Sequence, residues 1–526
     1  MYKRNLGFFL IMLIVSIALI GCADNTDNSN QEEGNNNDNE VKGGQLDFAY
    51  HVQPATLDPH LTVNDATRDI SAHIFEALLT LDTSLEVQPM LAESYELSDD
   101  RKMITFNLRQ GVKFHNGEEM TADDVIASME RWKTLSSQAE TYLEEMTFEK
   151  EDDYTVIAHI PNPTIQDLYI LADTAQFAAI MPEEIIENAS IEGVEDMIGT
   201  GPYKFVEWKT DNYIHVEKFD DYQSRSEEPN GMSGQKNAYL DDIYFHLITD
   251  PSTRIAGLQS GDYDIASDIP PDSALNFLND DNFQTAVDFS SFTPINFNKK
   301  EGVFKDKKIR QAANAAINVE DLLEAAYVNE EFYELDHALV KKEQTGWYSD
   351  VGSDVYNTYD PELAKELLDE AGYDGEEVVI ITSREYANYY NMSVVVKEQL
   401  EAVGMKVKLD VTDWASVSQK REDPEKFDIF FNRFMIRPLP TQYLFMSNEW
   451  FGWTDSEELE ELSEKILYAD SLEEAQSYTD ELHEVYWDYI PILKPGNTAL
   501  ITTYTKNVKG FDYMSNPILW NVQLEE

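Results

Sequence analysis

The feature that most constrains the fold is an alternation of helical and strand patterns between Asp360 and Asn432. Asp360-Pro361 predicts a helix start, with a capping carboxylate and a proline in the first turn, and Gly372 predicts its end. Glu377–Thr382 (EVVIIT) contains a continuous apolar run, which is typical of a strand covered on both faces. The segment therefore opens with a helix followed by a buried strand.

The same alternation continues for two more strands. A second helix ends at Gly404, Lys406–Val411 alternates as a strand, and Trp414–Arg421 is a helical stretch. Phe427–Asn432 (FDIFFN) is the third predicted strand. This order predicts parallel strands joined by right-handed crossovers, an α/β architecture. Because such sheets bind ligands at the carboxyl ends of their strands, the end of the third strand is the predicted site. Further strands are predicted at residues 44–50, 105–108, 154–159, 203–207 and 243–248.

The N-terminus has the pattern of an export signal. Lys3 and Arg4 precede the apolar run Leu6–Ile20, which is short for a membrane span of about 20 residues. The run leads into Leu-Ile-Gly-Cys, which resembles a bacterial lipobox ending at Cys22. That resemblance implies a signal peptide over 1–21 and acylation of Cys22. The alternative is a plain cleavable signal with an incidental cysteine.

Cysteine usage and the following segment favour the lipoprotein interpretation. Cys22 is the only cysteine of the 526 residues, so no intrachain disulfide can form. Residues 23–44 are rich in Asn, Asp and Gly and contain a single large apolar residue, Val41. Such a stretch cannot bury enough surface to offset its ordering entropy. We therefore predict that residues 22–44 are a lipidated cysteine with a disordered tether, on the outer face of a bacterial cell membrane.

The charge balance limits the possible partners. Lys and Arg number 39 against 100 Asp and Glu, which gives a formal net charge of −61. This acidity excludes nucleic acid or anionic lipid as the main partner, so the membrane is contacted through the lipid anchor only. A saline or an alkaline exterior would each suit such a surface.

An ordered series of short motifs extends along most of the chain. The longest is Ile104–Gly117 (ITFNLRQGVKFHNG), which continues to Thr121–Val125 (TADDV). The others are PATLDP at 54–59, LAES at 91–94, GTGPY at 199–203, LQSGDYDI at 258–265, IRQA at 309–312, YDP at 359–361 and EAGY at 370–373. Their order and spacing resemble the family 5 extracellular solute-binding proteins, the dipeptide, oligopeptide and nickel binders of ABC importers.

The resemblance implies a type II periplasmic-binding-protein-like fold, with two lobes and a ligand cleft between them. It places lobe I at 45–81, 199–289 and 491–526, an extra subdomain of lobe I at 82–198, and lobe II at 290–490. It also implies two partners encoded elsewhere, a membrane permease and a cytoplasmic ATPase.

The segment after the third predicted strand carries the main candidate site residues, Asn432, Arg433 and Arg437. Dipeptide and oligopeptide binders of the family often have an aspartate here, whereas this chain has no acidic residue between Asp428 and Glu449. Asn-Arg is closer to the nickel- and opine-binding branch, although that branch's nearby histidine is missing. Arginine recognises carboxylates through two parallel hydrogen bonds. We expect a carboxylate-bearing solute, the alternative being salt bridges to the acidic surface.

Four further residues are candidates for contact with the solute. Trp414 follows the second parallel strand, and Phe292 and Tyr390 lie near predicted strand or helix ends between the lobes. Asn296 lies where the chain is expected to cross toward lobe II. For the aromatic residues the alternative is core packing, and for Asn296 it is a role in holding the backbone of the crossing.

No catalytic or metal-binding motif stands out. The nine histidines lack zinc-type spacing, and no nucleophile elbow or phosphate loop is present. We therefore expect neither a cofactor nor an enzyme, but capture of a peptide, a peptide-like amino-acid derivative or a metal chelate. The alternatives are a secreted hydrolase of peptides or surface polymers and a sensing or adhesion lipoprotein that works without a transporter.

Overall fold

A computed structural model describes residues 43–525 of the chain. The predicted signal segment 1–21 and Cys22 lie outside the described residues, as does the predicted tether apart from Gly43 and Gly44. Within residues 43–525, no helix has both the length and the hydropathy needed to cross a bilayer. The described residues are the body that follows the predicted tether.

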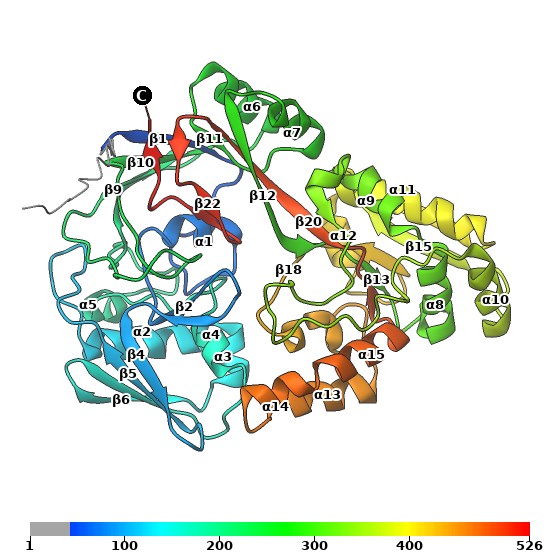
Figure 1. Cartoon of the computed structure of the whole chain (residues 1–526), viewed down its shortest axis with the longest axis horizontal. Coiled ribbons are helices and arrows are strands. Elements are labelled where there is room, and N and C mark those ends of the chain that lie inside the picture. The colour runs from blue at the N-terminus through cyan, green and yellow to red at the C-terminus, as the bar shows by residue number, and fades with distance from the viewer. Residues whose placement is uncertain (1–42, 526) are drawn as a thin grey trace, which may run out of the picture. The chain divides into compact units, whose positions relative to one another are not determined.

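The larger of the two main sheets has nine strands (Figure 1). Strand β1 (Gln45–Tyr50) forms because its alternate residues Leu46, Phe48 and Tyr50 are buried in a core, while Asp47 lies on the opposite face. The sequence-predicted strands confirmed in this sheet are those at 44–50, 203–207 and 243–248. In spatial order the strands are β18 (Phe434–Met435), β12 (Phe283–Phe292), β20 (Asn497–Thr505), β11 (Ile265–Ala266), β1, β10 (Asp242–Leu247), β9 (Tyr213–Lys218) and β8 (Tyr203–Lys209). The ninth strand, β14 (Tyr333–Glu334), pairs with β20 outside this order.

The second main sheet has five strands and contains the predicted alternating segment. In spatial order they are β16 (Lys406–Val411), β15 (Glu377–Thr382), β17 (Ile429–Phe431), β13 (Ile295–Phe297) and β19 (Ile492–Leu493). The pairings of β15 with β16 and with β17 are parallel, as predicted, whereas β13 pairs antiparallel with β17 and with the edge strand β19. β17 is shorter than the predicted 427–432, and just before it the Asp428 carboxylate accepts a hydrogen bond from the backbone N–H of Val379.

The helices of this segment begin and end at the predicted signals. Asp360 caps α10 (Pro361–Ala371) by accepting hydrogen bonds from two backbone N–H groups, and Gly372 ends it with φ +71°. The crossovers between the parallel strands are α11 (Ala387–Ala402) and α12 (Trp414–Lys420). The predicted α/β order is confirmed here.

A third, four-stranded antiparallel sheet lies within residues 92–159. It has its own core, in which Phe106 and Trp132 are almost fully buried. Its strands are β4 (Ala92–Leu97), β5 (Met103–Leu108), β7 (Thr155–His159) and β6 (Thr147–Asp152). Around it lie β2 (Leu79–Leu81), β3 (Val87–Pro89), α2 (Ala122–Leu135), α3 (Ser137–Tyr142), α4 (Asp167–Leu171) and α5 (Glu183–Glu187). We refer to this unit as the extra subdomain, to the part built on the nine-stranded sheet as lobe I, and to the part built on the five-stranded sheet as lobe II.

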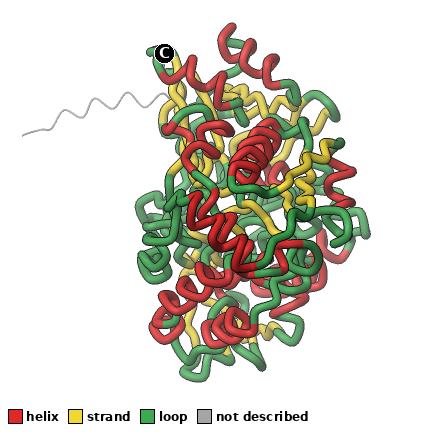
Figure 2. The backbone as a smooth tube through the Cα atoms, turned by 90° about the vertical axis from the view of Figure 1, so that its right-hand side faces the viewer, coloured by secondary structure: helices red, strands yellow, loops and turns green. Residues whose placement is uncertain are grey.

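Helices are distributed over the whole height of the body (Figure 2). The remaining α-helices are α1 (Asp65–Ser71), α6 (Pro251–Ser260), α7 (Pro271–Leu278), α8 (Lys307–Ala316), α9 (Val319–Tyr327), α13 (Glu457–Leu467), α14 (Leu472–Ser477) and α15 (Thr479–Tyr489). Short 3₁₀ turns occur at Val303–Lys305, Glu330–Phe332, Pro440–Gln442 and Leu444–Met446. The C-terminal segment forms two small pairs, β21 (Val508–Lys509) with β24 (Gln523–Leu524) and β22 (Asp512–Tyr513) with β23 (Pro517–Ile518).

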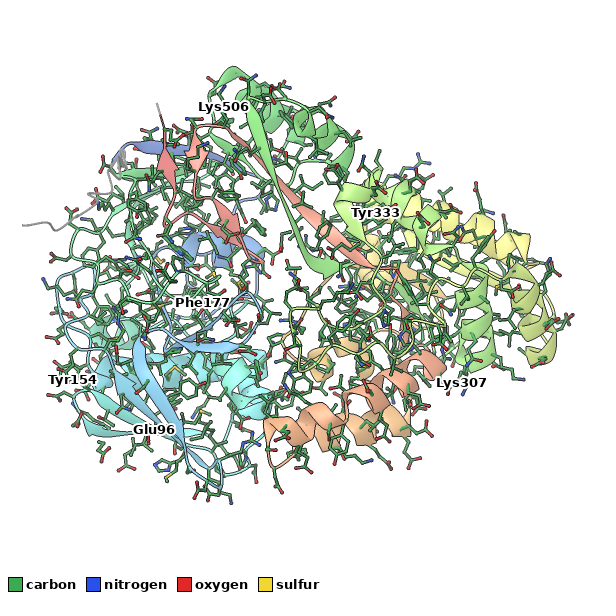
Figure 3. The ribbon with its side chains drawn as sticks, in the orientation of Figure 1. Glu96, Tyr154, Phe177, Lys307, Tyr333 and Lys506 are labelled. Carbon is green, nitrogen blue, oxygen red and sulfur yellow. The ribbon has the colours of Figure 1, made fainter. Side chains whose placement is uncertain are left out.

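The chain passes between the two main sheets at three short crossings. These are residues 293–294 between β12 and β13, 432–433 between β17 and β18, and 494–496 between β19 and β20. In Figure 3, Lys506 lies just beyond one end of β20, and Tyr333, which pairs with Thr498, marks the other end. Asn432 and Arg433, two predicted site residues, form the second crossing.

Candidate functional site

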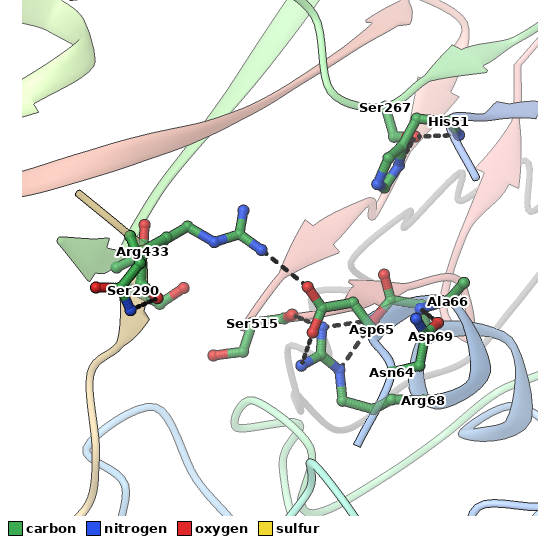
Figure 4. A network of polar contacts seen from close by, with 12 residues as sticks. His51, Asn64, Asp65, Ala66, Arg68, Asp69, Ser267, Ser290, Arg433 and Ser515 are labelled. Atoms are coloured by element: carbon green, nitrogen blue, oxygen red, sulfur yellow. Dashed lines mark hydrogen bonds and ion pairs between the residues drawn. The ribbon is translucent and has the colours of Figure 1, made fainter. Parts of the chain in front are cut away.

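Arg433 lies between β17 and β18, and its side chain points toward lobe I (Figure 4). Its Nη2 is 2.8 Å from Oδ2 of Asp65, the first residue of α1. The two side chains are 368 residues apart in the sequence and are 36% and 37% exposed. One half-exposed ion pair thus joins the crossing at the end of the five-stranded sheet to lobe I.

Charges of both signs line a small cavity at this ion pair. We call it the crossing pocket and define it by His51, Asp65, Asp268, Arg433 and Tyr513. Its volume of about 30 Å³ holds only about one or two water molecules. In this conformation the crossing pocket is therefore too small for a peptide-sized solute.

A buried network supports the acidic side of the crossing pocket. Arg68 donates to Oδ1 of Asp69 at 2.9 and 2.7 Å and forms an ion pair with Asp65 at 3.1 Å. The Tyr50 hydroxyl donates to Oδ2 of Asp69 at 2.6 Å. Burial raises the pKa of Asp69 to about 6, although the charge of Arg68 opposes the shift. Arg68 is therefore already engaged, and Arg433 is the more exchangeable cation.

His51 faces the same pocket from the residue after β1. Its Nδ1 is 3.1 Å from the hydroxyl oxygen of Ser267, which also accepts its backbone N–H at 3.2 Å. Burial lowers the pKa of His51, against the raising effect of Asp268. The imidazole is therefore neutral at neutral pH and contributes hydrogen bonding rather than charge.

Arg437, the second predicted arginine, follows β18. Its backbone N–H donates to the hydroxyl of Tyr443 at 3.2 Å, and its carbonyl accepts from Nε2 of Gln344 at 2.9 Å. Within residues 43–525 its guanidinium takes part in no hydrogen bond or ion pair. A cation in a very acidic body with no protein counter-ion is free to meet an anionic group of a solute.

Two predicted contact residues are buried supports in this conformation. Asn296 is fully buried, and its Nδ2 donates to Oδ1 of Asn432 at 2.8 Å, which fixes the crossing. Phe292 is also fully buried, with its ring 5.7 Å from that of Phe434 and with Nζ of Lys494 5.4 Å from its centroid. Both side chains are buried in this conformation, and their contact with a solute stays a prediction.

Trp414 and Tyr390 lie at the carboxyl ends of the parallel strands, but in different surroundings. Trp414, half-buried, packs against Tyr386 at 4.8 Å and Tyr389 at 5.6 Å between ring centroids. The charge of Arg433 opposes the rise that burial causes in the pKa of Tyr389, so this aromatic group lies close to the crossing. Tyr390 instead stacks under the Arg384 guanidinium at 4.7 Å.

Residues 43–525 contain no group of three or more His, Cys, Asp or Glu side chains that could hold a metal ion. His115, which lies in the longest motif, uses both ring nitrogens internally, toward the backbone of Gly201 and Gly199.

Two lobes joined by three crossings, with a mixed-charge pocket at one of them, form a two-lobed α/β fold of the periplasmic-binding-protein type. A model of the bacterial extracellular solute-binding proteins, family 5 (middle), matches residues 86–454. The chain therefore belongs to the family 5 bacterial extracellular solute-binding proteins.

Named relatives span nearly the whole chain. It is 29% identical over 498 residues to a probable peptide ABC transporter periplasmic-binding protein, y4tO, of Sinorhizobium fredii, covering 89% of this chain and 91% of the relative. It is 26% identical to the oligopeptide-binding protein AppA of Bacillus subtilis, covering 99% and 98%. The structure of AgaA from A. tumefaciens R10 with agropinic acid matches with a TM-score of 0.73 at 25% identity, covering 92% and 99%.

Several residues of the crossing pocket were not foreseen from the sequence. His51, Asp65, Asp268 and Tyr513 come from lobe I, far along the chain from Arg433. Asp65 is an ordinary first-turn carboxylate of a helix, and no local pattern links it to an arginine 368 residues away.

Proposed function

We propose that this chain is the solute-binding component of an ABC importer and captures a small, carboxylate-bearing, peptide-like solute between lobes I and II. The observation that carries the proposal is the Arg433–Asp65 ion pair across the lobes. Ion pairs of this exposure contribute about 0–1 kcal/mol, so a solute carboxylate can replace Asp65 on Arg433 at little cost. The planar guanidinium suits such a carboxylate.

The mixture of charges points to a zwitterion. The exposed Asp268 can meet an ammonium group while Arg433 holds the carboxylate that replaces Asp65. Peptides and amino-acid derivatives carry both groups at neutral pH, and a metal chelate with a free carboxylate offers the anionic half. The relatives whose names mention peptides, oligopeptides and agropinic acid support this class of solute.

Binding works through lobe movement. Because the crossing pocket now has room for only about one or two waters, the lobes open to admit a solute and close on it. The solute shifts this equilibrium by its greater affinity for the closed form. The permease recognises the closed form, and the ATPase drives transport.

The anchor and the domain extents belong to the same proposal. Acylation at Cys22 holds the body by residues 22–44 near the permease, on the outer face of the membrane. Lobe I comprises 45–81, 199–289 and 491–526, with the extra subdomain at 82–198 and lobe II at 290–490. β19 lies just past residue 490 but pairs in the five-stranded sheet of lobe II.

The test begins with the solute that the protein itself retains. Gently purified protein is denatured, and the released small molecules are identified by mass spectrometry. Calorimetry then compares wild-type protein with Arg433→Ala. We expect at least about a ten-fold loss of affinity, because a hydrogen-bonded charged contact is removed.

The matched control is Lys408→Ala, which removes one positive charge from an exposed strand position of lobe II. It should leave affinity unchanged. Unchanged affinity in Arg433→Ala would remove this residue from the site. Steady breakdown of peptides by the purified protein would contradict the binding function itself.

A further inference from the structure

A second, much larger cavity lies between the extra subdomain and lobe II. Its volume is about 480 Å³. One wall comes from residues 84–101 and 160–169, and the other from residues 344–347, Pro438 and 470–476. We call it the subdomain chamber. It lies within the size range of small-molecule sites, about 300–1,000 Å³.

The chamber is closed by contacts that need no solute. Nη1 of Arg101 donates to the carbonyl of Ala469 at 2.9 Å, and the backbone N–H of Ile165 donates to the carbonyl of Leu467 at 2.8 Å. Both bonds cross from the extra subdomain to the turn after α13. These two hydrogen bonds join the walls in this conformation, while the chamber stays hollow.

The walls are mostly apolar, and of the charged groups in the lining three are carboxylates and one is the cation Arg101. Half-buried or buried apolar side chains from both sides face the cavity, among them Leu85, Leu168 and Trp347. The exposed carboxylates Glu86 and Asp470 lie at its edge. An apolar, uncharged group gains free energy by leaving water here, whereas an acidic group would meet like charge.

The chamber is connected to the predicted carboxylate-binding segment through Gln344. Its Nε2 donates to the carbonyls of both Arg437 and Pro438, at 2.9 and 3.0 Å. Gln344 and Pro438 line the chamber, and Arg437 is the residue just before Pro438, with a guanidinium that has no partner within residues 43–525. Arg437, a cation that can meet a carboxylate, and Pro438, which lines the apolar chamber, are therefore neighbours in one short segment.

We propose that the subdomain chamber selects the solute by accepting an uncharged apolar side chain, of branched aliphatic or aromatic size. This inference rests on the proposed function, because it names a property of the solute that the lobes capture. The solute class is then a peptide-like carboxylate with an apolar arm, and acidic arms are disfavoured.

The test uses four dipeptides as probes: Gly-Gly, Gly-Leu, Gly-Phe and Gly-Glu. Calorimetry compares wild-type protein with Leu168→Trp, which fills the chamber from α4, and with Leu363→Trp, an exposed leucine of α10 that serves as matched control. Circular dichroism checks that each variant is folded.

We expect wild-type protein to bind Gly-Phe or Gly-Leu about ten-fold or more tightly than Gly-Gly, and Gly-Glu no better than Gly-Gly. Leu168→Trp should abolish this preference while still binding Gly-Gly, and Leu363→Trp should keep it. If Leu168→Trp does not fold, Val87→Phe, which fills the chamber from β3, replaces it with the same expectation.

Two failures are distinguishable. Binding of all four dipeptides without an apolar preference, or a preference that survives in the chamber variants, overturns the chamber proposal and leaves the proposed function standing. Absence of binding by all four, together with no solute released from the purified protein, overturns both.

Discussion

The crossing pocket and the subdomain chamber both border lobe II, but their walls are held together in different ways. In the crossing pocket the contact is one ion pair, Arg433 with Asp65, in which each side chain is more than a third exposed. In the chamber, Arg101 and Ile165 make hydrogen bonds to backbone carbonyls beside buried aromatic packing. The first region is small and charged, and the second is large and apolar.

The two regions differ in how much their contacts contribute to the stability of the fold. A side-chain ion pair at this exposure contributes about 0–1 kcal/mol, so it can be exchanged for a solute group without loss of the fold. Buried aromatic side chains contribute several times more, so the chamber walls are part of the core. Substitutions should therefore change stability strongly at the chamber and weakly at the crossing pocket.

The largest expected effect is that of Trp347→Ala. Trp347 is 4% exposed, packs in the core of lobe II and faces the Tyr169 hydroxyl of the extra subdomain. Its removal should lower the free energy of unfolding by about 3–5 kcal/mol, because a large buried side chain is lost and a cavity remains. Denaturant unfolding measures the change.

The matched control for this substitution is Tyr468→Ala, which truncates an aromatic residue that is 63% exposed. It should change the free energy of unfolding by less than about 0.5 kcal/mol. A loss below about 1 kcal/mol for Trp347→Ala would mean that the chamber wall is not part of the core.

An intermediate effect is expected from pH at Asp167, a buried carboxyl of the chamber wall. Burial raises its pKa from 3.8 to about 6, although Thr164 donates two hydrogen bonds to it. Because the folded state holds this proton more tightly than the unfolded chain, the carboxyl lowers stability above pH 6. That cost is relieved as the pH falls.

The measurement is the difference in free energy of unfolding between wild-type protein and Asp167→Asn at pH 7 and pH 5. From pH 7 to pH 5, the free energy of unfolding of the wild-type protein should rise by about 1 kcal/mol relative to that of the variant. Buried histidines such as His60, whose pKa burial lowers to about 4, make the free energy of unfolding fall as the pH falls. Because they are present in both proteins, their contribution cancels when the wild-type protein is compared with the variant at each pH. Asp354→Asn, at an exposed position, should show no such gain.

The fold was predictable where local signals and tertiary structure agree. Asp360 and Gly372 bound α10 because capping depends on neighbouring backbone groups only. The apolar run at 377–382 became a central parallel strand because both its faces need cover. The strands β13 and β19, which extend the sheet beyond β17, were not foreseen from local patterns, since two- and three-residue strands are fixed by their partners and carry no periodic pattern.

The candidate site was predictable on one side only. The end of the third strand pointed to Asn432 and Arg433, and the structure places both at a crossing between the main sheets. The opposite side depends on which lobe I residues meet that crossing, and Asp65 reaches it through the packing of two lobes. The burial of Phe292 likewise follows from contacts with Phe434 and Tyr443, which a linear pattern does not reveal.

The smallest expected effect concerns the ion pair of the crossing pocket. A double-mutant cycle of Arg433→Ala and Asp65→Ala should give a coupling free energy in unfolding below about 1 kcal/mol, reduced further by salt.

For solute binding the two residues should act in opposite directions. Because Asp65 occupies the guanidinium that the solute carboxylate needs, Asp65→Asn should tighten binding by up to about five-fold. In an Arg433→Ala background the same substitution should have no effect, since there is no longer a cation to release. Weaker binding by Asp65→Asn would contradict the proposal that Asp65 occupies the Arg433 guanidinium until a solute carboxylate replaces it. It would instead assign Asp65 to the ammonium group of the solute.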